Sequence, residues 1–372
     1  MTPAPTIVGI DLGKNWFHLI GLDAHGATVV RRRLNRSQLA AYAVTVPPCI
    51  IATEACPGSQ YWGRVFARAG HEIRILPAQF VKPYLKANKN DFNDAAAIAE
   101  AGGRASMRCV PLKTIEQLEL QALHRVRRRF VIERTAVVNQ MRALLLEHGI
   151  VIPLGRALFA RRLPAIFAEA EQSLSPRLVA LLHRLRQRWL TIEVEIDEAT
   201  QDLSAWAAQS DLCRRAVTVP GIGPMIATAV VAAVGDGHMF SHGRDMAAWL
   251  GLVPRQHSTG GKPTLGHISK RGNTYLRELF IQGAQSSFLY LKRDQSSLGQ
   301  WLRQVEARCH RQIAVVALAN KMVRICWKVL TSEQVYAPYP AHVVSHRSVV
   351  GLRGMSCCDG PTVDRRTVSL TE

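Results

Sequence analysis

The sequence of 372 residues contains no uninterrupted apolar run of about 18 residues, the length at which a helix becomes a candidate to cross a bilayer. Its first residues, Met1–Thr6, hold no basic cluster followed by an apolar stretch, so we expect no secretory signal. No C-x-x-C pair occurs among the eight cysteines, and the 13 histidines do not stand near them at zinc-finger spacing. We therefore expect a cytoplasmic protein, not a membrane protein, whose thiols are reduced and mostly structural.

Acidic residues are scarce relative to basic ones, since 28 Asp and Glu stand against 47 Lys and Arg, a formal net charge of +19. This excess predicts an anionic partner, with nucleic acid as the first expectation and an acidic membrane surface as the second. Hydrophobic residues make up 48% and charged residues 20%, an ordinary globular balance that excludes wholesale disorder. Residues 211–330 hold 16 basic and 6 acidic side chains, so we expect the main polyanion contact there.

Residues 1–110 alternate short apolar runs with helical stretches. Three successive strands are predicted first, separated by turn signals, at Ile7–Leu12, Trp16–Leu22 and Ala27–Arg33. Helices and strands then alternate: a helix at Ser37–Val44 capped by Ser37, a strand at Cys49–Glu54, a helix at Gly58–Ala69, a strand at Glu72–Leu76 and a helix at Asp91–Gly102. This order predicts an α/β sheet layered with helices.

Residues 111–210 are expected to be almost entirely helical. One series of apolar residues recurs every seven positions, and a second alternates spacings of four and three. The first series is Leu123, Phe130, Val137 and Leu144, and the second is Leu178, Leu182, Leu185, Trp189, Ile192, Ile196, Ala199, Leu203 and Trp206. These heptads favour a coiled-coil seam over two amphipathic helices of one globular domain. A Pro-containing stretch, Ile152–Pro164, is expected to connect the helices.

Four carboxylates in the first region form a candidate metal site. Asp11 and Glu54 end two apolar strands, and Asp91 and Asp94 stand three apart at the start of a helix, so they share one helix face. Such a cluster repels itself unless cations neutralise it, and its hard oxygen ligands suit Mg²⁺ or Mn²⁺ in a phosphodiester reaction. The alternative for the helical pair is a simple cap and dipole partner. Three nearby cations are expected to face the phosphate backbone: Lys82, Lys86 and Lys89.

Residues 211–330 are predicted to be helical with Gly-rich interruptions, and to end in the apolar helix Gln312–Leu330. The first interruption places Gly221 and Gly223 before a helix at Met225–Val234. Glycines at a helix start free backbone N–H groups that can hold a DNA phosphate, as in half of a helix-hairpin-helix motif. A plain tight turn is an equal alternative. Residues 331–372 show no periodicity and are expected to be a poorly ordered tail.

The second interruption runs from Gly251 to Asn273 and contains Ser258 and Thr259 beside two glycines. A hydroxyl in this setting could attack phosphate, while cations stabilise the charge of the transition state. A basic phosphate-binding loop without chemistry is the alternative that the residues alone favour. The cations of this segment are Arg255, Lys262, Lys270 and Arg271.

Taken together, these motifs resemble the insertion-sequence 110 family of transposases, also called DEDD transposases, which are relatives of the Piv site-specific invertase. The resemblance covers residues 5–330 and rests on I-V-G-I-D-L-G-K, T-E-A, K-N-D-F-N-D-A, P-G-I-G-P, G-L-V-P-R-Q-H-S-T-G-G-K and S-K-R-G-N. The last two segments are most similar to the 1111 subgroup of that family.

The resemblance implies a RuvC-like, RNase H-type domain over residues 1–110, whose DEDD set is Asp11, Glu54, Asp91 and Asp94. It implies a helical coiled-coil region over residues 111–210 that mediates oligomer contacts. It further implies a helical transposase domain over residues 211–330, whose serine forms a covalent phosphoserine link with DNA.

We expect Ser258 to be that serine, because it is the only one between Gly251 and Lys262, with Thr259 as the alternative. The family also implies a structured, non-coding bridge RNA that pairs with target and donor DNA, and we expect a homo-oligomer, either a dimer or a tetramer. Two other functions stay open. One is a RuvC-like nuclease or resolvase that hydrolyses branched DNA with metals alone. The other is a DNA- or RNA-binding regulator with a degenerate nuclease domain, against which four intact carboxylates argue.

Overall fold

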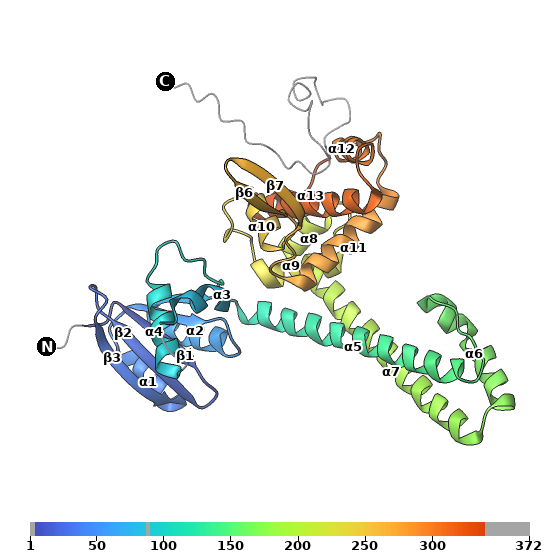
Figure 1. Cartoon of the computed structure of the whole chain (residues 1–372), viewed down its shortest axis with the longest axis horizontal. Helices are drawn as coiled ribbons and strands as arrows, with labels where there is room; N and C mark the ends of the chain where they lie inside the picture. Colours follow the sequence, from blue (N-terminus) through green and yellow to red (C-terminus); the bar gives the residue numbers. More distant parts are fainter. Residues whose placement is uncertain (1–3, 87–89, 339–372) are drawn as a thin grey trace. The chain divides into compact units, whose positions relative to one another are not determined.

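The computed structural model describes residues 4–86 and 90–338 (Figure 1). Lys89, Cys357, Cys358 and most of the expected tail therefore lie outside the described residues. The chain divides into two compact units, Met1–Ile115 and Glu116–Glu372. No helix of the described residues is long and apolar enough to span a membrane. The described cysteines are all free thiols, at positions 49, 56, 109, 213, 309 and 326.

The first unit contains a five-stranded sheet in the order β3-β2-β1-β4-β5. The strands are β1 (Ile7–Leu12), β2 (Trp16–Leu22), β3 (Thr28–Asn35), β4 (Ile50–Glu54) and β5 (Glu72–Leu76). Strands β1, β2 and β3 pair antiparallel, whereas β4 pairs parallel with both β1 and β5. The predicted α/β sheet is thus confirmed, and its three meandering strands are followed by two parallel ones.

Helices cover both faces of this sheet, as Figure 1 shows. Side chains alternate between the two faces along each strand, so Ile10 and Phe17 pack towards α1 (Arg36–Thr45) and α2 (Ser59–Arg68). The opposite face, which includes Ile7 and Ala52, packs against α4 (Asp91–Gly102). The short α3 (Ala78–Val81) and the 3₁₀ turn η1 (Lys82–Tyr84) precede α4. The cap of α1 is Asn35 and not Ser37 as predicted, because Asn35 accepts the backbone N–H of Gln38.

Helix α4 lies unusually close to strand β1, and Gly9 makes this possible. A Cβ atom at Gly9 would stand 2.3 Å from the carbonyl oxygen of Ala95 and 2.4 Å from the nitrogen of Ala99. Real Cβ contacts are never this short, so any side chain at position 9 would push the helix away. The close approach brings the first turn of α4 next to the end of β1.

The second unit begins with a long helical hairpin. It consists of α5 (Ile115–Leu146), α6 (Arg156–Ser173) and α7 (Pro176–Gln209). The connection expected over Ile152–Pro164 is wrong in part, because α6 starts at Arg156 and carries Pro164 inside it. The predicted seam exists, but Leu182, Trp189, Ile192 and Ile196 are buried against α5 and α6 of the same chain. The seam thus closes within one molecule.

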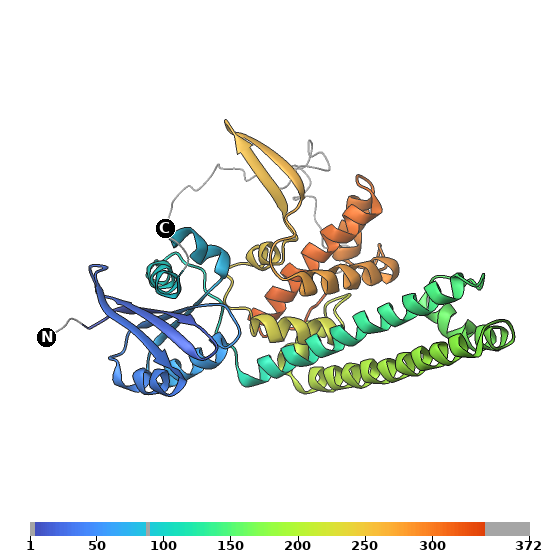
Figure 2. The same cartoon turned by 60° about the horizontal axis from the view of Figure 1, so that its bottom comes forward.

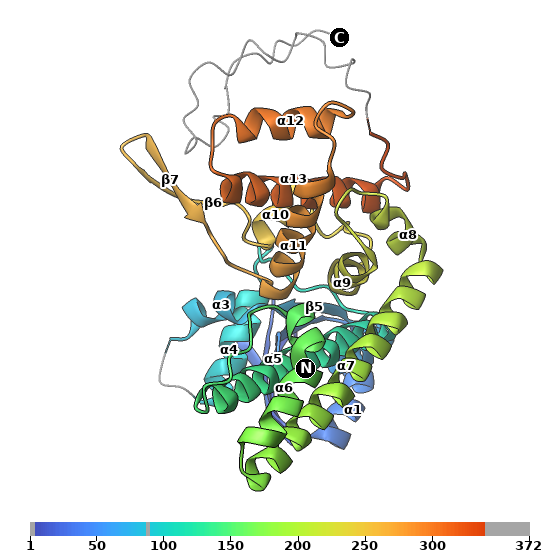
Figure 3. The same ribbon diagram turned by 90° about the vertical axis from the view of Figure 1, so that its right-hand side faces the viewer.

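The remaining helices of this unit form its main core. They are α8 (Asp211–Val217), α9 (Pro224–Val234), α10 (Gly243–Trp249), α11 (Thr274–Tyr290), α12 (Ser297–Glu306) and α13 (Arg311–Thr331). Helix α13 packs against α8, α10, α11 and α12, an arrangement that Figure 3 shows from the side. Its inward face, which includes Leu318 and Met322, is fully buried.

One element departs from the predicted helical character of residues 211–330. Strands β6 (Pro254–Thr259) and β7 (Lys262–Ile268) form an antiparallel hairpin where we expected a loop. Its turn is Gly260–Gly261, with φ angles of 58° and 77°, which only glycine adopts readily at two successive positions. The hairpin projects from the helices of its unit, as Figure 2 shows, and all six residues of β6 are exposed.

Candidate active site

The ends of β1 and β2 bring an aspartate and a histidine together. Asp11 on β1 is directly paired with His18 on β2, so the two side chains lie on the same face of the sheet. The first turn of α4 adds Asp91, whose Oδ2 lies 3.3 Å from His18 Nδ1. One ligand atom from each of Asp11, His18 and Asp91 lies within 4.8 Å of the other two.

Two further carboxylates surround this triad. Ala52 on β4 is paired with Gly9 on β1, so Glu54 and Asp11, each two residues further on, end neighbouring strands on the same face. Asp94 lies one helix turn after Asp91. Burial raises the pKa of the Asp11 carboxyl above its ordinary value, and the negative charges of Asp94, Asp91 and Glu54 raise it further, with His18 acting in the opposite direction. The carboxylates that the sequence singled out therefore interact electrostatically around Asp11.

The donor set around Asp11 fits a divalent cation. Carboxylate oxygens from a strand and a helix converge, and their mutual repulsion is the condition that a bound cation relieves. The imidazole of His18 adds a nitrogen donor or an orienting partner, and its ring packs edge-on against Phe92 at 4.8 Å between centroids. Sequence reasoning missed His18. The only signal was its position opposite Asp11 across the turn at Gly13–Asn15.

Two of the three predicted phosphate-facing lysines, Lys82 and Lys86, are among the described residues. Lys82 is exposed in η1. Lys86 instead forms an ion pair with Glu100, 2.7 Å from its Oε2, which neutralises its charge locally. Lys89 lies outside the described residues. A role in phosphate binding stays a prediction for these residues.

Ser258 and Thr259 lie at the tip of the β6–β7 hairpin. Ser258 is paired with Pro263, and Thr259 with Lys262, directly before the glycine turn. The Oγ of Ser258 accepts a hydrogen bond of 2.8 Å from Nε2 of Gln256. The hairpin and its continuation to Asn273 contain no Asp or Glu, so no carboxylate within this segment can act as a base for Ser258.

The basic side chains of this segment are all exposed: Arg255, Lys262, Lys270 and Arg271. The backbone that carries the last two is held in place by the buried Arg277 of α11. Its Nη1 donates to the carbonyl oxygens of Leu250 and Arg271, at 3.0 and 2.9 Å. The buried guanidinium thus fixes the S-K-R-G-N segment while leaving its cations free to face a polyanion.

The two predicted phosphate-binding glycines have different surroundings. Gly221 has a φ of +85°, and a Cβ atom there would stand 2.6 Å from the carbonyl oxygen of Gly283. Packing against α11 therefore accounts for glycine at this position. Gly223, the N-terminal cap of α9, has open space where its Cβ would be. Of the two, only Gly223 offers an approach to a ligand, and phosphate binding stays a prediction.

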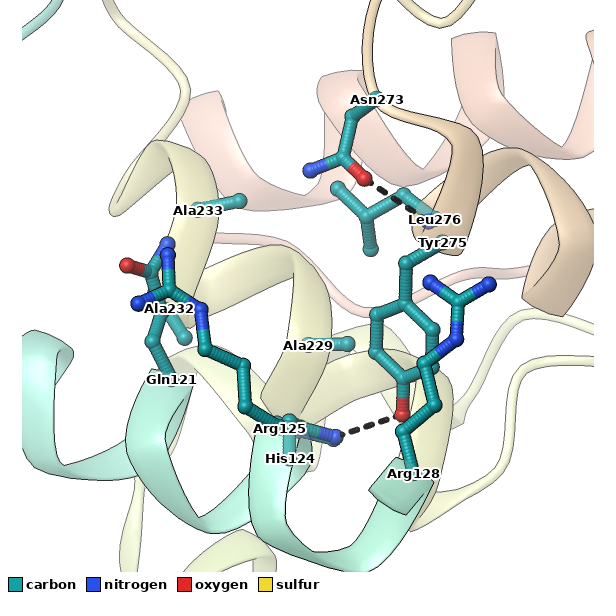
Figure 4. Close-up of a pocket in the computed structure, with 10 residues that line it drawn as sticks. All are labelled: Gln121, His124, Arg125, Arg128, Ala229, Ala232, Ala233, Asn273, Tyr275 and Leu276. Atoms are coloured by element: carbon teal, nitrogen blue, oxygen red, sulfur yellow. Dashed lines mark hydrogen bonds between the residues drawn. The ribbon is translucent and has the colours of Figure 1, made fainter. Parts of the chain in front are cut away.

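A cavity of about 200 Å³ in the second unit lies between α5, α9 and the start of α11, and Asn273 of the second Gly-rich segment lines it (Figure 4). His124 of α5 is buried beside it, 3.0 Å from the hydroxyl of Tyr275 and 3.0 Å from the hydroxyl of Thr228. The hydroxyl of Thr228 donates its single proton to the carbonyl oxygen of Pro224 at 2.7 Å, so its oxygen accepts from Nε2–H of His124. The other ring nitrogen, Nδ1, then accepts from the hydroxyl of Tyr275. Burial lowers the pKa of His124 to about 4, with Arg127 adding to the effect. The neutral imidazole joins α9, which follows P-G-I-G-P, to α11, which follows S-K-R-G-N.

Comparison with known proteins identifies the chain's relatives. A family model described as a DEDD transposase of the IS110 type matches residues 8–150, and one described as Transposase IS116/IS110/IS902 family matches residues 213–297. The chain is 43% identical to the transposase for insertion sequence element IS1328 of Yersinia enterocolitica over 335 residues, 90% of this chain and 99% of the relative. It is 42% identical to a probable family 20 transposase of Pseudomonas aeruginosa over 332 residues, 89% of this chain and 98% of the relative. It is 41% identical to the transposase for element IS1111A of Coxiella burnetii over 330 residues, 89% of this chain and 91% of the relative. The chain is therefore a DNA transposase and belongs to the IS110 family.

Proposed function

We propose that this transposase cuts and rejoins DNA strands through a transient covalent bond to Ser258, aided by a divalent metal held at Asp11, Glu54, Asp91 and Asp94. The proposal depends on two observations: carboxylates converge around Asp11 in one unit, and an exposed serine lies on a hairpin without Asp or Glu in the other. The carboxylates provide negative charge and metal ligands, and the hairpin provides the hydroxyl.

The metal is proposed to be Mg²⁺ or Mn²⁺. The DEDD transposase family implies dependence on a divalent ion, and oxygen-rich donor sets suit these two metals. When bound, such an ion polarises a phosphoryl oxygen and lowers the pKa of an attacking hydroxyl. The antiparallel β1-β2-β3 meander followed by parallel β4 and β5 supports a RuvC-like, RNase H-type assignment for this unit.

The covalent step exchanges one phosphoester bond for another. The Ser258 hydroxyl loses its proton, its oxygen forms a bond to phosphorus, and one bond from phosphorus to a deoxyribose oxygen breaks. That deoxyribose oxygen leaves with a proton. The reverse attack by the hydroxyl of another strand releases Ser258 and joins the new pair of ends. We propose that exposed cations of the same hairpin, Arg255 and Lys262, stabilise the charge that develops on the phosphoryl oxygens.

We further propose a structured bridge RNA as guide and a homo-oligomer as the working form. Sixteen basic residues against six acidic ones in residues 211–330 supply the charge that RNA and DNA both require. Strand exchange needs at least two cleavage sites held together. Because the heptad seam is buried within one chain, the contact between copies uses other surfaces of the molecule.

The test is to trap the protein–DNA bond. Wild-type protein is incubated with a divalent metal, DNA carrying the ends of its own element, and RNA transcribed from that element. The mixture is denatured, and adducts are resolved by gel electrophoresis and located by mass spectrometry. We expect an adduct at Ser258 that Ser258→Ala removes and that Thr259→Ala and the control Ser269→Ala retain.

Other outcomes separate the alternatives. Loss of the adduct only in Thr259→Ala would move the nucleophile by one residue. Metal-dependent cleavage with no adduct in the wild-type protein would favour a nuclease or resolvase and overturn the covalent step. Loss of all strand cleavage in Asp11→Asn, with the fold retained, is expected under both mechanisms, so it tests the metal centre separately.

A further inference from the structure

Strand β3 forms one edge of the sheet and carries three consecutive arginines, Arg31, Arg32 and Arg33. Arg33 is paired with His18, which is itself paired with Asp11. These three side chains therefore form a row across the sheet, on the face that α4 covers. Because strand side chains alternate, Arg31 shares this face and Arg32 lies on the opposite one.

Two aromatic rings hold the arginines of this face. The guanidinium of Arg31 lies 4.2 Å from the ring centroid of Phe92, the residue after Asp91. The guanidinium of Arg33 lies 4.2 Å from the ring of Trp16, which is itself 45% exposed. Stacking of this kind orients a guanidinium without neutralising its charge.

The charges of these two arginines are not balanced by an acid among the described residues. Within residues 4–86 and 90–338, no ion pair joins Arg31 or Arg33 to a carboxylate, and both are exposed. Lys86 differs from these arginines, because its charge is balanced by an ion pair with Glu100. Two oriented, uncompensated cations thus stand beside a cluster of carboxylates that by itself would repel a polyanion.

We propose that Arg31 and Arg33 form a phosphate-binding edge that holds the DNA strand next to the carboxylate cluster, with Trp16 as a surface on which a base stacks. The proposal rests on the metal-centred DNA chemistry proposed above. Adjacent strands are about 4.8 Å apart, so β3 lies about 10 Å from β1. Each strand of a DNA duplex carries one phosphate per ~3.4 Å of helix axis, so a strand with one phosphate at Asp11 has neighbouring phosphates within reach of both arginines. Aromatic rings interleaved with cations are typical of sites that bind single strands.

Arg32 supplies a matched control. It lies on the same strand, is also exposed and carries the same charge, but it is on the opposite face, where its guanidinium lies 5.8 Å from the ring of Tyr42. Arg31→Gln, Arg33→Gln and Arg32→Gln therefore each remove one charge from one strand, and they differ only in the face that carried it.

The experiment measures binding of the full chain to a fluorescent single-stranded oligonucleotide by anisotropy, over a range of salt concentrations. All variants carry Asp11→Asn, so that cleavage does not interfere. For each phosphate that the protein no longer neutralises, the log–log salt slope is expected to fall by about 0.7. We expect this fall, with weaker binding at low salt, for Arg31→Gln and Arg33→Gln and a larger fall for the double variant. Arg32→Gln and the charge-preserving Arg31→Lys should leave the slope unchanged, and thermal melting should show that all variants fold.

An equal fall in the salt slope for all three glutamine variants would show that only the net charge matters, and it would overturn the proposal. Unchanged slopes for Arg31→Gln and Arg33→Gln would also overturn it. Both results are distinguishable from failure of the proposed chemistry, because the adduct assay does not depend on this binding measurement and could still succeed.

Discussion

The imidazole Nδ1 of His18 lies 3.3 Å from the carboxylate Oδ2 of Asp91. The histidine side chain is nearly buried and the aspartate side chain is mostly exposed, at 11% and 63% of their free areas. The buried imidazole of His18 thus contacts the exposed carboxylate of Asp91 and restricts its rotation. If the cluster holds a metal as proposed, we expect His18 to be a ligand or the group that orients Asp91.

This contact predicts that His18→Ala weakens metal binding by about 10-fold or more, the usual effect of losing a ligand or its orienting partner. The measurement is a titration with Mn²⁺ followed by electron paramagnetic resonance, which needs no DNA and no activity. His25→Ala, in an exposed turn of the same unit, is the control and should bind Mn²⁺ as the wild type does. Equal affinity in all three proteins would remove His18 from the metal centre.

The raised pKa of Asp11 predicts that its charge destabilises the metal-free protein. A carboxyl whose pKa is higher in the folded state costs stability once the pH is high enough to ionise it. Asp11→Asn should therefore raise the melting temperature at pH 7 in a chelating buffer. The gain should shrink as the pH falls and Asp11 becomes protonated in the wild type. Added Mg²⁺ should stabilise the wild type but not Asp11→Asn. The exposed control Asp202→Asn should melt as the wild type does, both in the chelating buffer and with Mg²⁺.

The buried His124 predicts an acid-sensitive second unit. Its pKa is about 4 when folded against 6.5 when exposed, so the unfolded chain binds a proton that the folded chain excludes. The free energy of unfolding that neutral His124 contributes is complete above pH 6.5. It falls by about 3 kcal/mol as the pH is lowered towards 4. Urea unfolding at several pH values should show this loss in the wild type. His124→Gln should be less stable at pH 7 but lack this pH dependence, and identical pH profiles would contradict the assignment.

The internal seam predicts that damage to it unfolds the hairpin and does not simply separate subunits. Ile192 is 1% exposed, so Ile192→Asp buries an unpaired charge and should cost about 3 kcal/mol or more. Leu190 on the same helix is 37% exposed, and Leu190→Asp should leave the melting temperature nearly unchanged. Circular dichroism gives stability, and light scattering gives the oligomer size. A stable Ile192→Asp protein that only changes oligomer size would show that the seam joins two chains.

The local pattern was enough to predict most elements of the first unit. Strands Ile7–Leu12, Trp16–Leu22 and Glu72–Leu76 and helix Asp91–Gly102 have the bounds that alternation and turn signals predict. Heptad spacing identified α7 but not its partner, because the spacing of apolar residues is the same whether they face another helix of one chain or a second copy. The β6–β7 hairpin was missed because most of its residues are polar, so it lacks the apolar alternation that predicts a strand, although Gly260–Gly261 is a common hairpin turn.

The sequence by itself determined the chemistry available to this protein: four carboxylates at strand ends and one helix start, one serine before two glycines, and a strong basic excess. The tertiary structure decided which of these groups meet. Register across three antiparallel strands put Asp11, His18 and Arg33 in one row, and the missing side chain of Gly9 let α4 bring Asp91 against them. Neither His18 nor Arg33 stands in a motif. Their placement depends on pairing between strands and on helix packing, which are long-range interactions that no local spacing encodes.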